Sequence, residues 1–227
     1  ESCENLDETA RAVARGTCLF SAQMCTSPQN IYVPKTGIST AAGHVSFEEV
    51  AQALVDAVDT IANNPAQAAG IMGAVQAQPS VDLVEELSSR LSEHPQARVL
   101  RRASPYKHPD YPDARTLTPL IVSLESGSAD IYAEEHFGPV MFIIASADGE
   151  EAVTEATSLA REHGAISSYL YSHSDDFCDW ATQAYMNSGM NLTINMHGAM
   201  WINFAAAYSD YHVTGLNPAG NACLTDL

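Results

Sequence analysis

The spacing of hydrophobic and polar residues predicts a helix and then a strand near the start of the chain. One helical face repeats at three-then-four spacing and consists of Ala10, Val13, Ala14, Thr17, Cys18 and Ser21. The short stretch Asn30-Ile31-Tyr32-Val33 is rich in β-forming residues and is followed by Pro34, which predicts a strand. We therefore expect Cys25 in a turn between a helix and a strand, exposed at one edge of a sheet.

The rest of the chain alternates between the two patterns. Ser46 and Glu49 form a capping-box pattern, and they predict a helix over 47–61 that ends near Asn63-Asn64-Pro65. Residues 140–144 are continuously apolar, as in a strand buried on both faces. Further helices are expected at 80–94, 150–163 and 175–190, further strands at 98–101, 120–122 and 168–171, and a surface loop at 105–115. This order predicts an α/β fold with layered helices around a mostly parallel central sheet.

Inside the last of these helices, the residues expected to face inward are Phe177, Trp180, Ala181, Ala184 and Tyr185.

Composition narrows the classes of partner. The formal net charge of −18 disfavours nucleic-acid and membrane partners, because phosphate backbones and anionic lipids are themselves negative. The five cysteines are scattered and odd in number, and no histidine pair has metal-ligand spacing, so we expect reduced thiols and no structural metal. The acidic N-terminus lacks the order of a secretory signal, which predicts a cytoplasmic protein.

Two short stretches carry candidate chemistry. The first is Ser21-Ala22-Gln23-Met24-Cys25-Thr26-Ser27, and the second is Glu134-Glu135-His136-Phe137-Gly138-Pro139-Val140. Together they resemble the aldehyde dehydrogenase superfamily, in which a G-Q-x-C-T segment carries the catalytic cysteine and an E-E-x-F-G-P-V segment binds the cofactor. The resemblance extends from Asn5 to Asn221 and implies the fold of the C-terminal catalytic domain of that superfamily.

The resemblance implies a role for three residues. Cys25 would attack an aldehyde to give a thiohemiacetal and then a thioester, with the oxyanion held by its own backbone N–H and an asparagine amide. Glu135 would bind the nicotinamide ribose hydroxyls of NAD or NADP, and Phe137 would pack beside the ribose or nicotinamide. Without the two motifs, Cys25 would be interpreted as a small core residue and Glu135 as a solvated surface charge.

An asparagine that follows a strand helps to shape the family's site, and two positions compete for it. Asn195 follows a glycine and a strand-like stretch, whereas Asn203 follows Trp201-Ile202 and has the better residue match. Either asparagine could instead bond to loop backbone. The sequence leaves both alternatives open.

The resemblance also implies what lies outside the chain. The family's general base, oxyanion asparagine and dinucleotide fold precede the cysteine by more than the 24 residues present here, and a C-terminal oligomerisation strand follows. We therefore expect residues 1–227 to be a catalytic domain that is inactive alone, with a homo-oligomeric full-length enzyme. The preference for NAD or NADP cannot be predicted.

The substrate class follows from a narrower similarity. The string C-T-S-P-Q-N-I-Y-V-P from Cys25 to Pro34 departs from the general pattern and is similar to the phenylacetic acid degradation branch. That likeness implies a small-molecule aldehyde as substrate, and within the branch a CoA-linked semialdehyde. Two alternatives are a cysteine hydrolase or acyltransferase, which would need a histidine base near Cys25, and a non-catalytic assembly domain.

Overall fold

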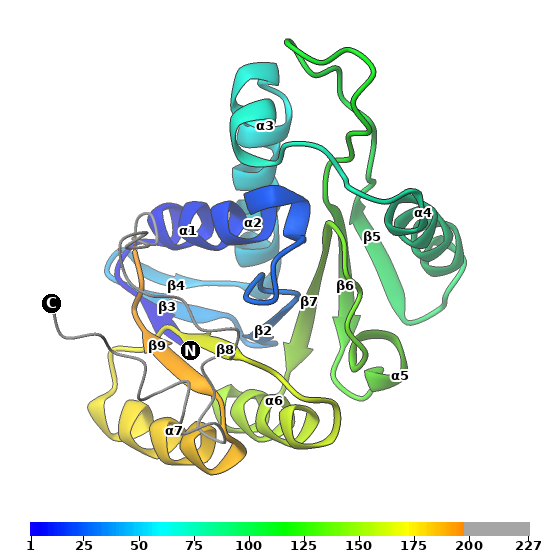
Figure 1. The fold of residues 1–227 in the computed structure, drawn as a ribbon. Helices are drawn as coiled ribbons and strands as arrows, with labels where there is room; N and C mark the ends of the chain where they lie inside the picture. The colour runs from blue at the N-terminus through cyan, green and yellow to red at the C-terminus, as the bar shows by residue number, and fades with distance from the viewer. Residues whose placement is uncertain (198–227) are drawn as a thin grey trace, which may run out of the picture.

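A four-stranded sheet forms the centre of the computed structural model, which describes residues 1–197 (Figure 1). Its strand order is β2-β7-β6-β5, where β2 is Asn30–Pro34, β7 Val140–Ser146, β6 Leu120–Glu125 and β5 Ala97–Arg101. Strands β2, β7 and β6 are parallel, and β5 is an antiparallel edge strand. The predicted α/β fold with a mostly parallel central sheet is confirmed.

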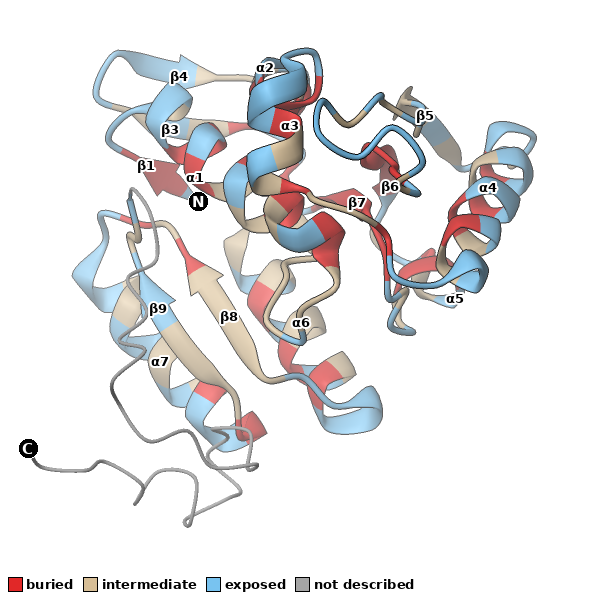
Figure 2. Ribbon diagram, turned by 45° about the horizontal axis from the view of Figure 1, so that its top comes forward, coloured by how far each residue is buried: buried red, intermediate tan, exposed pale blue. Residues whose placement is uncertain are grey.

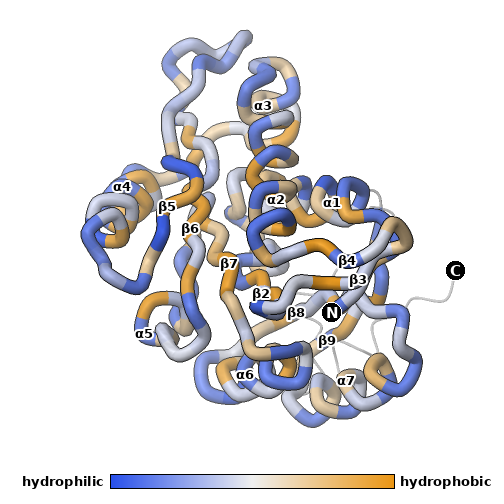
Figure 3. Tube along the Cα trace, turned by 180° about the vertical axis from the view of Figure 1, so that it is seen from behind, coloured by the Kyte–Doolittle hydropathy of each residue, from blue (hydrophilic) through white to orange (hydrophobic). Residues whose placement is uncertain are grey.

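Strand β7 is buried on both faces, as its unbroken apolar sequence predicts (Figure 2). Helices α1 (Leu6–Cys18) and α2 (Phe47–Ala62) pack over the face that carries Met141 and Ile143. Helices α4 (Gln78–Ser92) and α5 (Ala129–Tyr132) cover the face that carries Phe142 and Ile144. The alternation of side chains along the strand thus divides the core into two layers, and hydrophobic segments meet along β6 and β7 in Figure 3.

Two smaller sheets flank the central one. Strands β1 (Ser2–Cys3), β3 (Ile38–Thr40) and β4 (Gly43–Val45) form one of them, and these short strands were not predicted. The other pairs β8 (Ser167–Leu170) with β9 (Asn191–Ile194) in parallel. Helices α6 (Gly149–His163) and α7 (Asp175–Ser188) pack against this pair through a third apolar cluster that includes Val153, Leu170 and Tyr185.

The capping residues explain where the helices begin. Ser46 and Glu49 form both bonds of the predicted capping box at the start of α2. Helix α2 ends at Ala62, close to the expected stop. Pro65 does not begin a loop, however: Asn64 caps a further helix, α3 (Pro65–Ile71), in which Pro65 occupies the first turn. A 3-10 helix, η1 (Leu19–Ala22), extends α1 toward Cys25.

Helix α7 packs on a narrower face than predicted. Ala181 and Tyr185 are buried, but Trp180 is 41% exposed and contacts the ring of Phe177. The inward placement of Trp180 was therefore wrong, because the buried face of the helix passes through positions 181, 185 and 188. Of the helices within residues 1–197, none combines the length and the apolar character needed to cross a membrane.

Candidate active site

Cys25 lies in a turn between η1 and β2, and it is exposed. The predicted helix-to-strand position is confirmed, at the edge of the sheet where β2 begins. Strand β7 begins at the same edge, because β2 and β7 are parallel and Asn30 pairs with Phe142. The Cys25 turn and the segment that precedes β7, which carries Glu135 and Phe137, are therefore neighbours.

The backbone immediately before Cys25 is strained. Phe20, Ser21 and Ala22 all have φ between 51° and 56°, a left-handed conformation that costs non-glycine residues roughly 1–2 kcal/mol each. Buried Ser21 donates its hydroxyl to the carbonyl of Met72 at 3.0 Å, which ties the strained turn to the segment after α3. Such strain persists only where surrounding contacts hold it, and it clusters at functional sites.

Gln23 fixes the start of the cysteine turn. Its amide nitrogen donates to the carbonyls of Phe20 at 2.8 Å and Ala74 at 3.1 Å. Its amide oxygen accepts from the backbone N–H of Gln76 at 2.8 Å. The glutamine of the cysteine motif therefore joins the turn to the loop that follows α3, and its side chain is a structural anchor for the backbone that leads to Cys25.

Glu135 is exposed and lines the same cavity as Cys25. The structure thus brings together the two residues that the motifs single out. Phe137 is 46% exposed, and among the described residues it is not part of the cavity lining.

Gln29, which the sequence interpretation noted only as a departure from the family pattern, contacts the Glu135 segment directly. Its amide oxygen accepts from the backbone N–H of His136 at 2.7 Å, and its amide nitrogen donates to the carbonyl of Glu134 at 3.0 Å. A longer bond of 3.3 Å reaches the carbonyl of Tyr132. No sequence signal assigns this contact, because it joins residues more than a hundred positions apart.

Asn195 lies at the end of β9, where its side chain is engaged by the loop after β8. Its amide nitrogen donates to the carbonyl of Ser172 at 2.8 Å, and its amide oxygen accepts from the N–H of Ser172 at 3.0 Å. Asn195 has φ +51°, a conformation that asparagine tolerates better than most residues. The loop-backbone alternative therefore describes Asn195, while Asn203 lies outside the described residues.

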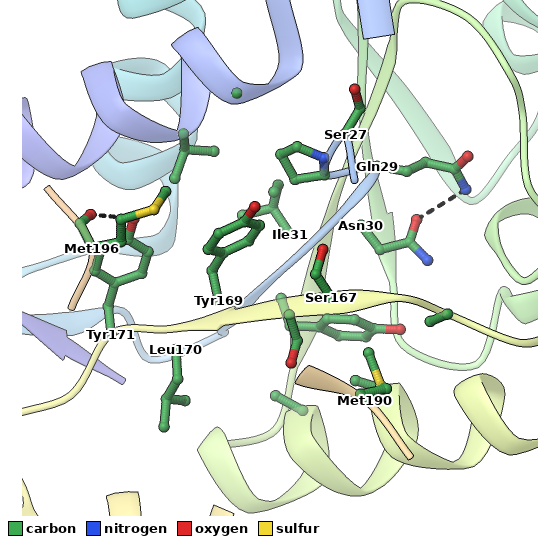
Figure 4. A pocket seen from close by; sticks show the side chains of 18 of the residues that line it. Ser27, Gln29, Asn30, Ile31, Ser167, Tyr169, Leu170, Tyr171, Met190 and Met196 are labelled. Carbon is green, nitrogen blue, oxygen red and sulfur yellow. Dashed lines mark hydrogen bonds between the residues drawn. The ribbon is translucent and has the colours of Figure 1, made fainter. Parts of the chain in front are cut away.

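The cavity next to Cys25 has a volume of about 1310 Å³ and lies between α1, β2, α6 and β8. Figure 4 shows Ile31, Tyr169, Tyr171 and Met190 among the side chains that line it. The hydroxyl of Tyr171 donates to the carbonyl of Met196 at 2.8 Å, so the phenol is satisfied, and its ring packs edge-to-face against His197. The cavity can accommodate a molecule of substrate size beside the thiol.

The described cysteines differ in their environment. Cys18 is fully buried, and burial raises the pKa of its thiol to about 12, so it stays protonated at neutral pH. Burial also raises the pKa of Cys3. A thiol reacts as its thiolate, and these two positions disfavour that form. Cys25 is exposed and Cys178 is half-buried. Within residues 1–197, no group of three potential metal ligands is placed together.

Cys25 is exposed and lines a cavity, so its sulfur is accessible to a small electrophile, as a cysteine nucleophile must be. Residues 1–199 match the sequence model of the aldehyde dehydrogenase family, and the chain belongs to this family. No curated protein matches the chain.

Solved structures that resemble the chain include aldehyde dehydrogenases. An NAD-dependent aldehyde dehydrogenase from Burkholderia multivorans is 40% identical, with a TM-score of 0.87; the match covers 98% of this chain and 39% of that protein. Betaine aldehyde dehydrogenase from Staphylococcus aureus, in complex with NAD+, is 18% identical, with a TM-score of 0.64 and coverage of 90% and 37%.

The NADP-dependent glyceraldehyde-3-phosphate dehydrogenase from Bacillus halodurans, complexed with NADP, is 19% identical, with a TM-score of 0.59 and coverage of 87% and 37%. It and the betaine enzyme show the fold alone. The chain spans about two fifths of the length of these structures.

Proposed function

We propose that this chain is the cysteine-bearing catalytic domain of an NAD(P)-dependent aldehyde dehydrogenase, in which Cys25 is the nucleophile. The observation that carries the proposal is that Cys25 and Glu135, each from a motif that resembles the family's, line one cavity. The related structures are more than twice as long, so in this proposal the general base and the dinucleotide fold come from outside residues 1–227.

Cys25 performs the covalent step in this proposal. The thiolate sulfur forms a bond to the aldehyde carbon, and the carbonyl electron pair moves to oxygen, which gives a thiohemiacetal oxyanion. After loss of hydride the same carbon is a thioester, and water cleaves its C–S bond to release the carboxylic acid and restore the thiolate. Cysteine suits both halves of this cycle because its thiolate is a good nucleophile and an adequate leaving group.

The exposed side chains fit a nicotinamide cofactor. The carboxylate of Glu135 can accept two hydroxyl hydrogen bonds from a ribose, and the ring of Phe137 offers an exposed aromatic face. When bound, the nicotinamide supplies the hydride acceptor. Two of the related enzymes were crystallised with NAD+ or NADP, which supports a cofactor of this class without deciding between the two.

The narrower substrate proposal is a CoA-linked semialdehyde, as the likeness of residues 25–34 to the phenylacetic acid degradation branch implies. The mainly apolar cavity lining is compatible with a hydrophobic acyl chain beside Cys25. In this proposal the enzyme works in the cytoplasm as a homo-oligomer.

The substitution Cys25→Ser in the whole enzyme tests the proposal. We expect NAD(P)H formation with a panel of free and CoA-linked aldehydes to fall by about 10³-fold or more, while cofactor binding changes little. Cys178→Ser is the matched control, because this cysteine lies on α7, away from the motifs. The Cys178→Ser enzyme should keep its activity within about twofold of the parent enzyme. A Cys25→Ser enzyme that kept its dehydrogenase rate would require another nucleophile.

A further inference from the structure

We infer that Gln29 is a positioning residue that fixes the direction of the Glu135 side chain toward the cofactor. The inference rests on the proposed function. Gln29 lies at the cavity lining, and Figure 4 shows its side chain and that of Asn30 extending away from Tyr169 and Tyr171. The amide instead reaches the segment that precedes β7.

The contacts of Gln29 hold both peptide groups attached to Glu135. The carbonyl of Glu134 belongs to the peptide group on the N-terminal side of Glu135, and it accepts from Gln29 at 3.0 Å. The N–H of His136 belongs to the peptide group on the other side, and it donates to Gln29 at 2.7 Å. With both planes fixed, the Cα–Cβ direction of Glu135 is fixed as well, while its carboxylate remains exposed.

The chemistry of these contacts selects glutamine. A backbone N–H can only donate and a carbonyl can only accept, so one side chain must present an acceptor and a donor about 2 Å apart. Glutamate lacks the donor, lysine and arginine lack the acceptor, and methionine has the length without strong hydrogen-bonding groups. Asparagine, as at Asn30, is one methylene shorter; the Asn30 amide nitrogen donates to the carbonyl of Tyr132 at 2.9 Å, and its oxygen accepts from the amide of Gln29 at 3.3 Å.

Other contacts make this anchor rigid. The backbone carbonyl of Gln29 accepts from the N–H of Phe142 at 2.8 Å, which starts the ladder between β2 and β7. The ring of His136 bonds to the carbonyl of Ile131 at 2.9 Å and packs against Phe142. Because Cys25 lies four residues before Gln29, the same strand end positions the nucleophile and the cofactor carboxylate relative to each other.

The first test measures amide hydrogen exchange in the 227-residue chain and needs no cofactor. Gln29→Met keeps the side-chain length but removes the bonds, so exchange over residues 133–137 should accelerate by about tenfold, the effect of one hydrogen bond. Helices α2 and α7 should keep their rates. Gln29→Glu keeps the acceptor for His136 and should give an intermediate rate. The matched control is Gln52→Met, because Gln52 is exposed and, among residues 1–197, its side chain bonds only to Asp56 on its own helix.

The second test measures cofactor affinity and Cys25 reactivity in the whole enzyme. Gln29→Met should raise the Kd for NAD(P) by about tenfold, while the alkylation rate of Cys25 changes less than about twofold. Equal acceleration of exchange throughout the chain would overturn the inference, because Gln29 would then be a general structural residue. Unchanged cofactor affinity would also overturn it. An enzyme that bound no NAD(P) even with Gln29 intact would refute the proposed function itself.

Discussion

The turn before Cys25 and the turn at Asn195 both hold non-glycine residues in the left-handed region, but the stabilising groups differ. Asn195 stabilises its own left-handed conformation, because its side-chain amide donates one hydrogen bond to the backbone of Ser172 and accepts another from it. In the cysteine turn the stabilising groups belong to neighbours of the proposed nucleophile: Ser21 bonds to Met72, and Gln23 bonds to three backbone groups.

This difference separates a structural turn from a turn that presents a side chain. The amide of Asn195 bonds through both its nitrogen and its oxygen to the loop backbone at Ser172. Near Cys25 and Glu135, the glutamines at positions 23 and 29 make the backbone contacts, while the cysteine and the glutamate line the cavity. The comparison predicts that substitutions in the turn before Cys25, such as at Ser21, lower the free energy of unfolding. Substitutions of Cys25 or Glu135 should instead lower the dehydrogenase activity.

After Cys25→Ser, the largest functional effect is expected for Glu135→Gln. Loss of the charged acceptor should weaken NAD(P) binding by about 1.5–3 kcal/mol, which is roughly tenfold to more than hundredfold in Kd. Cys25 should still react with an alkylating agent, because in the proposed function Glu135 holds the cofactor and does not contact the thiol. Titration of cofactor and alkylation kinetics measure the two effects separately.

Glu85→Gln, at an exposed position on α4, is the control for the charge change. If Glu135→Gln bound and used cofactor like the parent, the assignment of Glu135 would have to be withdrawn.

A smaller effect, on stability, is expected for Asn195→Ala. The change removes two hydrogen bonds and places alanine at φ +51°, so the free energy of unfolding should fall by about 2–3 kcal/mol. Asn195→Gly loses the same bonds without the conformational penalty and should cost about 1 kcal/mol less. Urea unfolding of both variants gives the difference. An Asn195→Ala enzyme of normal stability but greatly reduced activity would place this asparagine in the active site.

The smallest effect is expected for Ser21→Ala. This change removes the buried bond to the carbonyl of Met72 and should lower the free energy of unfolding by about 1 kcal/mol. Ser92→Ala removes an exposed bond within α4 and should change it by less than about 0.5 kcal/mol. Denaturant unfolding of the pair compares the two serines. Equal values would show that Ser21 does not support the strained turn.

Periodicity and capping chemistry predicted the larger elements of the fold. The capping box at Ser46, the buried strand β7 and the strand that follows Cys25 all need only local sequence. The two- and three-residue strands β1, β3 and β4 are too short to show a period of two, so they could not be recognised. Helix α3 could have been found, because Asn64-Pro65 is a cap followed by a residue favoured in the first turn.

Only the residues of the candidate site that stand in the two motifs could be predicted from the sequence. Cys25 and Glu135 stand in recognisable strings, and their shared cavity agrees with that interpretation. The contacts of Gln29 depend on which strands pair, and a single sequence does not state the pairing. The environment of Asn195 likewise depends on the tertiary fold, because its partner Ser172 lies in a different loop.

Because β2 pairs with β7 in parallel, the geometry of the site does not depend on how many residues lie between its two motifs. Register alone sets the spacing of the Cys25 turn and the Glu135 segment, since Asn30 lies opposite Phe142 whatever connects the two strands. The stretch from 102 to 119, which contains no helix or strand, is a place where insertions and deletions can accumulate without altering that spacing. Cys25 and Glu135 can thus stay together while the surface loop between their two motifs diverges.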